Sequence, residues 1–438
     1  MTRWAWPEVA DLPGTIHVPD SSAAARPHDH RRLTEIYCFL FWIALGQIGS
    51  ANPPWFERSL VGLELYAHIK SQAPRVSVDF NYHGSPPFSF EVGQRPVQHA
   101  QNADFVTGET GVWGFSALGV SLNAQFYRAA TPKRPVQVAI QRSVRTYHDQ
   151  TTRPLHDIRW ELFTLLAHGA FVTMVDKTAF DGWLDPVAYE RIGLAFAEAQ
   201  RKRGHFGHQP VYDVGLYFSS RTRDWIGRED AARYWQSFYG AHKACVLEHF
   251  QFGVLLDENV SLNELQRFPV VCLPNVAILS RHEVAQLRGY VEQGGKLLVT
   301  GYSGQFDRWG KPLAESALSE LIGATVTRRL DSMDNWLNLE NGADSPSASH
   351  RPASGSSVQV EGCATAAPAL PMLARDLPTG WPFLVEGPAT LYAPTTAVPV
   401  GALLEPHRTA RQRQGTEGLH WPMSADAPVG AAILIHRL

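Results

Sequence analysis

Residues 268–301 read FPVVCLPNVAILSRHEVAQLRGYVEQGGKLLVTG, and they predict a strand, a helix and a second strand. The apolar run at the start is typical of a buried strand. Ser280 with Glu283 three residues later is a capping box that begins a helix, and the Gly-Gly pair ends it. The run KLLVT then forms the second strand. A helix between two such strands joins parallel neighbours, so we expect an α/β sheet.

The segments on the N-terminal side of this stretch continue the same alternation. Val211–Ser219 and Phe252–Leu256 are expected strands, and Glu229–Phe250 is an expected long helix between them. A further short helix is expected over Leu313–Ile322. This spacing of strands and helices predicts a flavodoxin-like open parallel sheet.

A first series of strands and helices precedes a polar linker at residues 205–210. Four strands are expected at Val76–Tyr82, Asp104–Glu109, Val136–Gln141 and Phe171–Asp176. Helices are expected at 31–48, 55–72, 96–101, 118–129, 154–168 and 186–202. All four strands end in polar or ionisable residues, and the carboxyl ends of parallel strands build the active site of a barrel. This half therefore predicts a parallel α/β domain with a site at its strand ends.

The last hundred residues have a different character. Residues 341–370 are rich in Ser, Ala, Pro and Gly, which is typical of a loop or a disordered segment. Phe383–Val385 and Ala431–His436 have strand-like composition but stand isolated in the sequence. We expect only a partial β domain there.

Composition limits the classes of protein and partner. The chain has 438 residues, enough for two or three domains. The 39 basic and 42 acidic residues give a net charge of −3 without a basic block, which argues against a nucleic-acid partner. The longest apolar run, Tyr37–Ile48, is too short to cross a bilayer, and the N-terminus lacks the layout of a signal peptide. Four widely spaced cysteines fit reduced thiols in the cytoplasm.

Three motifs in the first half and one run in the second half carry a family resemblance. VDFNYHG (78–84), ADFVTGET (103–110) and IRWELFTLLAHGA (158–170) resemble the second half of the catalytic barrel of family 42 beta-galactosidases. Residues 211–330, with the run quoted above, resemble the beta-galactosidase trimerisation domain, whose fold is like that of class I glutamine amidotransferases. The order of the two segments is more specific than either motif.

The resemblance implies a division of the chain into four parts. Residues 1–30 form an irregular leader, 31–205 a glycoside hydrolase domain like a TIM barrel without its early strands, 211–330 the trimerisation domain, and 331–438 a linker with a partial β domain. The predicted fold class is therefore α/β: an incomplete or divergent (β/α)8 barrel, a flavodoxin-like open parallel sheet and a partial C-terminal β segment.

The first half departs from the family pattern in two ways. A complete barrel needs about 250 residues, and only four strands are assigned here. The family carries an acid/base Glu after strand four and a nucleophile Glu at the end of strand seven. No Asn-Glu strand end precedes Val76, and Gln141 stands near the nucleophile position. An amide is neutral and is a very poor nucleophile.

Glu109 and Asp79 are the candidate catalytic carboxylates. Retaining hydrolysis needs two carboxyl groups roughly 5–5.5 Å apart, and inverting hydrolysis needs a wider gap. Glu109 ends a strand between two glycines, and Trp113 follows as an aromatic for stacking on a sugar. Alternation along its strand would place Asp79 on one face with Asn81 and His83, as sugar-binding groups or as an interior polar network.

Further candidates follow the later strands. Asp176 binds substrate, pairs with Lys177 or, in place of Asp79, opposes Glu109 as the second carboxylate. Gln141 and Arg142 would orient substrate. Trp183 would form a wall of the sugar site. His168 is expected to pack helix against strand, with Gly169 allowing close approach. Trp160 is expected in the core and Glu161 on the surface.

The second half offers no catalytic set of its own. An amidotransferase needs a nucleophilic Cys at a strand-to-helix turn, but the matching turn is Thr300-Gly301-Tyr302-Ser303-Gly304. Cys272 lies among apolar neighbours and is expected to be inert. We expect a scaffold for oligomerisation there, with a homotrimer implied by the resemblance. We predict no metal site and no cofactor, although His28, Asp29 and His30 could bind an adventitious metal.

Two hypotheses of function remain. The first is a cytoplasmic glycoside hydrolase-like protein of the beta-galactosidase clan that hydrolyses O-glycosidic bonds of a carbohydrate substrate. The second is a non-catalytic carbohydrate-binding or assembly protein derived from such an enzyme. Gln141 and the missing strand-four Glu favour the second hypothesis.

Overall fold

The chain divides into two compact units, which are described separately. The computed structural model describes residues 54–79, 96–101, 103–109, 112–131, 136–144, 151–176, 181–228, 231–330, 334–339, 382–404 and 430–438. The first unit runs to Tyr212 and includes Gly253–Asn259, and the second contains Asp213–Phe252 and the residues from Val260 onward. The expected leader, the helix over 31–48 and the loop over 341–370 lie outside the described residues.

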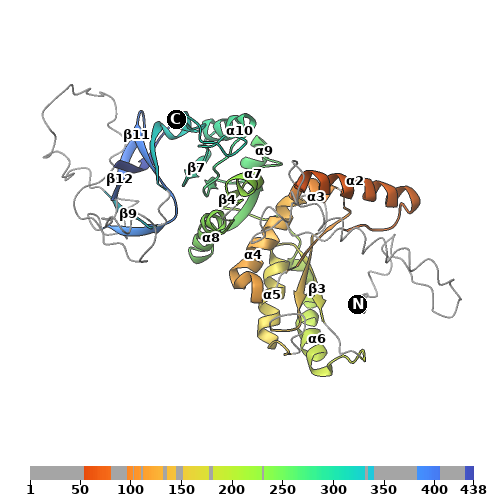
Figure 1. Ribbon diagram of the computed structural model, residues 1–438. Helices are drawn as coiled ribbons and strands as arrows, with labels where there is room; N and C mark the ends of the chain where they lie inside the picture. The colour runs from red at the N-terminus through yellow and green to blue at the C-terminus, as the bar shows by residue number, and fades with distance from the viewer. Residues whose placement is uncertain are drawn as a thin grey trace, which may run out of the picture. The chain divides into compact units, whose positions relative to one another are not determined.

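The first unit contains a three-stranded parallel sheet with the order β1-β2-β3. The strands are β1 (Val106–Glu109), β2 (Val136–Gln141) and β3 (Phe171–Val175). The helices, coloured from red to yellow-green in Figure 1, are α2 (Pro54–Gln72), α3 (Pro96–Gln101), α4 (Val112–Ala130), α5 (Leu155–Ala167) and α6 (Pro186–Arg201). The short η2 (Arg203–His205) follows α6. The expected alternation of parallel strands and helices is confirmed.

One face of this sheet packs against helices. Val138 and Ile140 of β2 are fully buried, and α4 and α5 both contact this strand. Gly108 of β1 is level with Val138, and a side chain at residue 108 would overlap the ring of Tyr127 on α4. The glycine next to the candidate Glu109 is therefore required by helix packing.

Two expectations for the first unit are wrong. The described part of the expected strand at 76–82, residues 76–79, is not a strand. Val78 bonds to the single residue Asp104, whose N–H donates to the Val78 carbonyl and whose carboxylate accepts the Val78 N–H, both at 2.8 Å. Trp160 is 43% exposed and Glu161 is fully buried, the reverse of the expected arrangement. Glu161 tolerates burial because Arg153 Nη1 lies 2.5 Å from its Oε2.

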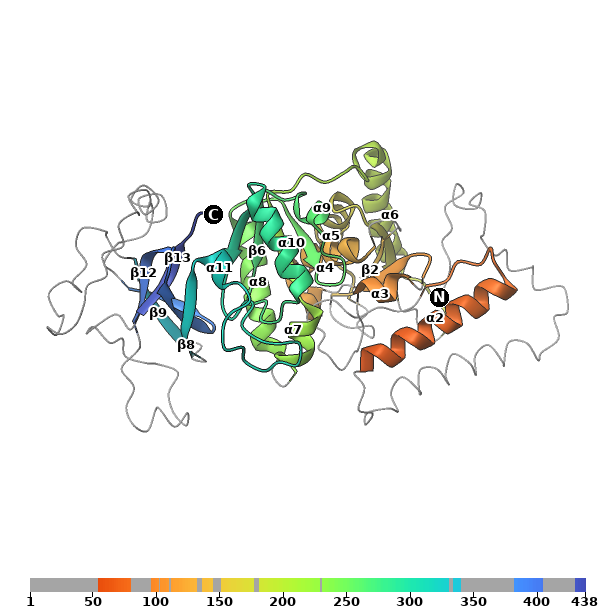
Figure 2. The same cartoon turned by 90° about the horizontal axis from the view of Figure 1, so that it is seen from above.

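A four-stranded sheet in the order β5-β4-β6-β7 follows the first sheet along the chain. The elements are β4 (Val214–Phe218), α7 (Ser220–Trp225), α8 (Ala231–Leu247), β5 (Phe252–Leu256), α9 (Leu262–Leu265), β6 (Val270–Leu273), α10 (Arg281–Glu292), β7 (Lys296–Val299) and α11 (Ser319–Ile322). Strand β6 is parallel to β4 and to β7. Helix α8 packs on β4 and α10 on β7. Both helices are labelled in Figure 2. In chain order the strands lie 2-1-3-4, the flavodoxin-like pattern that was predicted.

The expected helix over Leu313–Ile322 is restricted to its last turn, α11. The N–H of Leu313 donates to the Gln305 carbonyl at 2.9 Å, and that of Ala317 to the Gly304 carbonyl at 2.8 Å. In a helix the Ala317 N–H would donate to the Leu313 carbonyl, so its bond to Gly304 replaces the i to i−4 pattern there.

The last part of the second unit is an antiparallel sheet with the order β10-β9-β12-β13-β11-β8. Its strands are β8 (Ala324–Leu330), β9 (Asp334–Leu339), β10 (Phe383–Glu386), β11 (Ala389–Pro394), β12 (Val398–Leu404) and β13 (Gly430–Ile435). Leu330, Leu391 and Leu403 form its buried core. The segments at 383–385 and 431–436 are therefore not isolated, because β10 and β13 pair with strands distant in sequence.

No helix in the described ranges has both the length and the apolar character needed to span a bilayer.

Candidate functional site

A polar face of the three-stranded sheet leads to the carboxyl ends of its strands. Side chains alternate between the two faces of a strand, so Gln137, Ala139 and Gln141 lie on the face opposite Val138 and Ile140. On this face Gln137 is partly exposed, while Gln141 is buried at 7% exposure. Gln137 Nε2 donates to Thr173 Oγ1 at 2.5 Å across β2 and β3. The register places Glu109 level with Ala139, and Gln141 level with Val175. This face carries hydrogen-bonding groups of the kind that bind sugar hydroxyls.

Arg142 joins two carboxylates at the carboxyl end of this sheet. Its side chain is 3% exposed, its Nε lies 3.6 Å from Asp176 Oδ1, and its Nη2 lies 2.8 Å from Asp185 Oδ2. The Arg142 N–H also donates to the Val175 carbonyl at 3.0 Å, which extends the pairing of β2 with β3 by one bond. A buried guanidinium needs such carboxylate partners to offset its lost hydration.

Asp185 is held as a carboxylate by several donors. It is the N-cap of α6 and accepts hydrogen bonds from the N–H groups of Val187 and Ala188, at 3.0 and 3.5 Å, and from Thr152 Oγ1 at 3.2 Å. Burial acts to raise the pKa of Asp185, but these bonds and the Arg142 charge outweigh it, so this pKa lies below its ordinary value. Asp185 is thus suited to holding Arg142 rather than to exchanging a proton.

Besides Arg142, Asp176 has a second partner, Tyr189, which lies on α6. The hydroxyl of Tyr189 donates to Asp176, and burial together with this negative charge raises the pKa of Tyr189. Asp176 therefore lies between Arg142 and Tyr189. This arrangement keeps the carboxylate in place at the strand end and engages it in protein contacts, which fits a binding role better than a nucleophilic one.

Arg153 holds the end of β2 in position. Its Nη1 donates to the Gln141 carbonyl at 3.0 Å and pairs with Glu161, while its Nε lies 2.7 Å from Asp157. Arg153 and Glu161 are both almost completely buried. The position of Gln141 thus depends on an ion pair inside the domain.

The structure brings together some of the predicted site residues. Gln141 and Asp176 meet at the same edge of the sheet, with Arg142 beside Asp176. Trp183 lies in the loop after β3 and is 58% exposed. Asp79 follows the irregular segment and is not on the sheet. Glu109 ends β1 and Trp113 is in the first turn of α4, but their side chains, like all of Asn81 and His83, lie outside the described residues.

Sequence reasoning missed Asp185, Tyr189 and Arg153. One signal was available for Asp185, because an acidic residue directly before Pro186 is the usual beginning of a helix. No local pattern identifies Arg153 as a buried partner of Glu161, since that requires knowing how the helix packs.

His168 connects the end of α5 to α4 and so packs helix against helix, where packing of a helix against a strand was predicted. Gln125 Nε2 lies 2.9 Å from its Nδ1 and Ser121 Oγ lies 2.9 Å from its Nε2. Because the amide group can only donate to Nδ1, the ring proton is assigned to Nε2. Burial, with a smaller contribution from the Arg128 charge, lowers the pKa of His168 to about 4. The ring is therefore neutral near pH 7.

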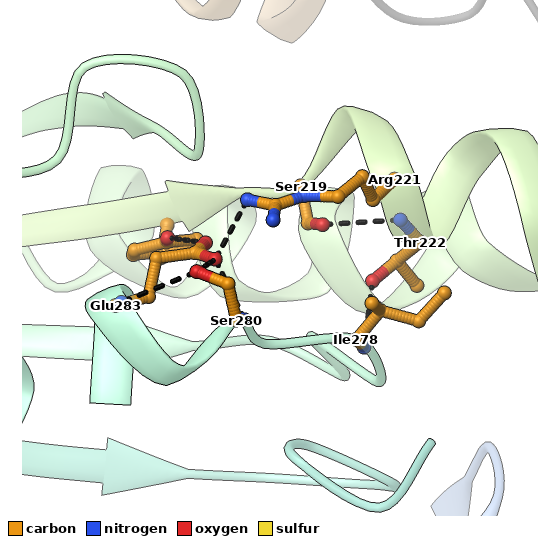
Figure 3. Close-up of polar contacts among 7 residues, drawn as sticks. Ser219, Arg221, Thr222, Ile278, Ser280 and Glu283 are labelled. Carbon is orange, nitrogen blue, oxygen red and sulfur yellow. Dashed lines mark hydrogen bonds and ion pairs between the residues drawn. The ribbon is translucent and has the colours of Figure 1, made fainter. Parts of the chain in front are cut away.

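In the second unit, a polar network connects β4 to the start of α10 (Figure 3). Glu283 accepts hydrogen bonds from Tyr217 Oη, from the N–H of Ser280 at 2.8 Å and from Ser280 Oγ. Arg221 Nη2 lies 2.6 Å from the same carboxylate. Glu283 is 1% exposed, so its charge and lone pairs are used inside the domain.

The carboxyl ends of β4 and β6 form the position where flavodoxin-like folds bind ligands. Here the backbone donors after β6 have internal acceptors: Val276 N–H donates to Ser303 Oγ at 2.9 Å and Ile278 N–H to Thr222 Oγ1 at 3.1 Å. Ser219 Oγ accepts from Thr222 N–H at 3.0 Å (Figure 3). These donors and acceptors are therefore bonded to each other within the domain.

The described cysteines do not supply an amidotransferase nucleophile. Cys245 and Cys272 are buried free thiols. Burial raises the pKa of both thiols, that of Cys272 to about 12, so neither is a thiolate near neutral pH. Within the described ranges, no three His, Cys, Asp or Glu side chains gather as ligands for a metal ion.

The fold of this chain is similar to that of several glycoside hydrolases of known structure. Alpha-L-fucosidase isoenzyme 2 from Paenibacillus thiaminolyticus superposes with a TM-score of 0.62 at 15% identity over 86% of this chain and 50% of its own. The beta-galactosidase from Bacillus circulans sp. alkalophilus gives 0.61 at 14%, over 85% and 57%. That from Rahnella sp. R3 gives 0.59 at 13%, over 78% and 50%. The chain spans about half the length of these structures, and identities this low show a shared fold.

The sequence itself identifies one domain. Residues 229–342 match the beta-galactosidase trimerisation domain. The chain is therefore like the family 42 beta-galactosidases in fold and carries their trimerisation domain, as the resemblance predicted. No curated protein sequence matches this chain.

Proposed function

We propose that this chain is a glycoside hydrolase-like protein that acts on the O-glycosidic bonds of a carbohydrate bound at the carboxyl ends of β1, β2 and β3. The observation that carries the proposal is the polar face of the sheet, with Gln137, Thr173 and Gln141, in a fold shared with beta-galactosidases. The domain assignments 31–205 and 211–330 and the homotrimer belong to the same proposal, and the buried free thiols support a cytoplasmic location.

Glu109 is the proposed acid or nucleophile. It is the last residue of β1, at the edge where active sites of parallel barrels form. Asp79 is the proposed opposing carboxylate, because Asp176 is engaged by Arg142 and Tyr189. Gln141, Asp176 and Trp183 are proposed to bind the sugar, together with Asn81, His83 and Trp113.

A second candidate function is carbohydrate binding without hydrolysis, or assembly alone. The specific observation in its favour is Gln141 at the end of β2, where the resemblance places a nucleophile, with the nearby Asp176 and Asp185 both paired to Arg142. An amide and two ion-paired carboxylates bind hydroxyl groups well but supply no ordinary nucleophile.

A panel of nitrophenyl glycosides that includes the beta-galactoside and the alpha-L-fucoside distinguishes the two functions. We expect turnover by the wild type and a fall in kcat of about 10²–10⁴-fold in Glu109→Gln, the range for a lost general acid. Glu190→Gln, an exposed change on α6, is the matched control and keeps wild-type turnover. Turnover that survives Glu109→Gln would contradict the site assignment.

Calorimetric titration with free sugars completes the test. Binding without turnover on any glycoside would support the second function and reject the first. Loss of that binding in Gln141→Ala, with folding intact, would place the sugar at the end of β2.

A further inference from the structure

Two tryptophans and two arginines form an exposed group in the second unit, which we call the aromatic–arginine cluster: Trp225, Arg228, Arg308 and Trp309. The indole rings of Trp225 and Trp309 meet edge to face, with centroids 5.5 Å apart at 89°. The Arg228 guanidinium lies 5.2 Å from the Trp225 ring, and that of Arg308 lies 4.7 Å from the Trp309 ring. Trp309 is 54% exposed, so a large apolar surface faces solvent.

The loop that presents Trp309 is held in one conformation. Asp307 Oδ1 accepts the N–H groups of Trp309 and Lys311 at 2.8 and 2.9 Å, and the Asp307 N–H donates to the Lys311 carbonyl at 2.8 Å. Gly310 has a φ of +76°, and a Cβ there would lie 3.4 Å from Trp225. The exposed indole is therefore preorganised, so binding a partner would cost little additional ordering.

The composition of the cluster is that of an interaction hot spot. Trp and Arg are the residues most enriched among side chains that dominate binding at protein interfaces. A rigid aromatic with exposed apolar area is favourable for contact because little side-chain entropy is lost. We propose that the aromatic–arginine cluster is the contact surface for a second copy of this chain.

The position and charge of the cluster argue for this partner. Arg308 and Trp309 lie inside the segment that matches the trimerisation domain, and Trp225 and Arg228 directly precede it. The cluster and the adjacent Lys311 carry three positive charges beside the single Asp307 carboxylate, while the whole chain has a net charge of −3, so the rest of the chain is acidic on balance. In a closed ring, each subunit applies one surface to a different surface of its neighbour, which lets a cationic patch meet an acidic one.

This inference rests on the homotrimer within the proposed function but not on hydrolysis. Sedimentation velocity of the full chain over a range of concentrations tests it without any substrate. The variants are Trp309→Ala and Arg308→Glu, and the matched control is Trp160→Ala, whose tryptophan is also exposed, in the first unit, at 43%.

We expect an oligomeric wild type whose dissociation constant rises at least about 30-fold in Trp309→Ala, the effect of a hot-spot side chain. Arg308→Glu should also weaken assembly, most strongly at low salt, and Trp160→Ala should match the wild type. If Trp309→Ala loses its circular dichroism spectrum, the surface variant Arg308→Glu decides.

Three results would overturn the inference: a monomeric wild type at every concentration, wild-type assembly in both variants, or equal weakening by Trp160→Ala. A fourth would reassign the surface. If added oligosaccharide quenches the tryptophan fluorescence of the wild type but not of Trp309→Ala, while assembly is unchanged, the cluster binds glycan and the subunit contact lies elsewhere.

Discussion

His168 couples the stability of the first unit to pH at the level of a single residue. Its pKa is about 4 in the folded chain because the ring is largely buried, while a free imidazole has a pKa of about 6.5. Between these values the unfolded chain binds the additional proton. The stability contributed by neutral His168 is therefore complete above pH 6.5 and is lost as the pH falls toward 4.

The contribution of His168 should appear as a pH-dependent difference between two proteins. We expect the free energy of unfolding of the wild type to fall by about 2 kcal/mol more than that of His168→Gln between pH 7.5 and pH 5. Urea unfolding at both pH values measures this difference, and subtracting the variant removes the titration of other groups. Equal pH dependence in the two proteins would mean that His168 does not carry the effect.

At the scale of the element, α10 begins at a capping box whose carboxylate also binds partners on other elements. Ser280 and Glu283 form the predicted capping box, and both halves of it are present. Glu283 also accepts from Tyr217 on β4 and pairs with Arg221 on α7. The same carboxylate therefore stabilises the helix start and joins three elements.

Substitutions at these two positions should differ in magnitude. Ser280→Ala removes one cap, and we expect a loss of about 1 kcal/mol in the free energy of unfolding. Glu283→Ala should cost about 3–5 kcal/mol, because Tyr217 and Arg221 lose a buried partner. Chemical denaturation compares the two variants, and equal losses would show that the network contributes nothing beyond the cap.

The same scale shows why some elements were predictable and others were not. The chain order of strands and helices from β4 to β7 could be predicted, because apolar runs, helix caps and glycines act within a few residues. The expected helix over 313–322 is shortened because Leu313 and Ala317 donate to a distant loop. The segments at 383–385 and 431–436 looked isolated because their partners in the antiparallel sheet are far away in sequence.

At the scale of the whole chain, Gly323 lies between α11 and β8, where the flavodoxin-like part of the second unit meets its antiparallel sheet. The Gly323 carbonyl accepts the N–H groups of residues 395–397, at 2.9–3.0 Å. Its φ is +63°, and a Cβ there would lie 2.6 Å from both Thr396 Oγ1 and His436 Cδ2. His436 is itself held by the Leu321 carbonyl at 3.0 Å. The flavodoxin-like part and the antiparallel sheet therefore depend on the absence of a side chain at this position.

Gly323→Ala should destabilise the second unit more than a conformational penalty alone explains. We expect a loss of about 2–4 kcal/mol, which combines the left-handed backbone with a steric overlap. Gly182→Ala is the matched control, because Gly182 has a φ of +81° and open space around it, so it should cost only about 1–2 kcal/mol. Thermal unfolding of both variants measures the difference, and equal shifts would contradict the steric argument.

The candidate site also combines features that could be predicted from the sequence with features that could not. Gln141 and Asp176 could be predicted as strand-end residues, since alternation and strand termination are local properties. The burial of Glu161, the exposure of Trp160 and the pairing of Arg142 with Asp185 could not, because each depends on how α5 and α6 pack against the sheet.

The sequence by itself determined the α/β class, the order of most strands and helices, and the presence of the trimerisation domain. These follow from hydrophobic periodicity and capping signals that act over a few residues, and from a motif long enough to recognise. Only the tertiary structure decided which charges are buried, which strands pair across long separations, and which tryptophans remain exposed. The reason is physical: burial and pairing are relations between distant segments, and their free energy appears only when those segments meet.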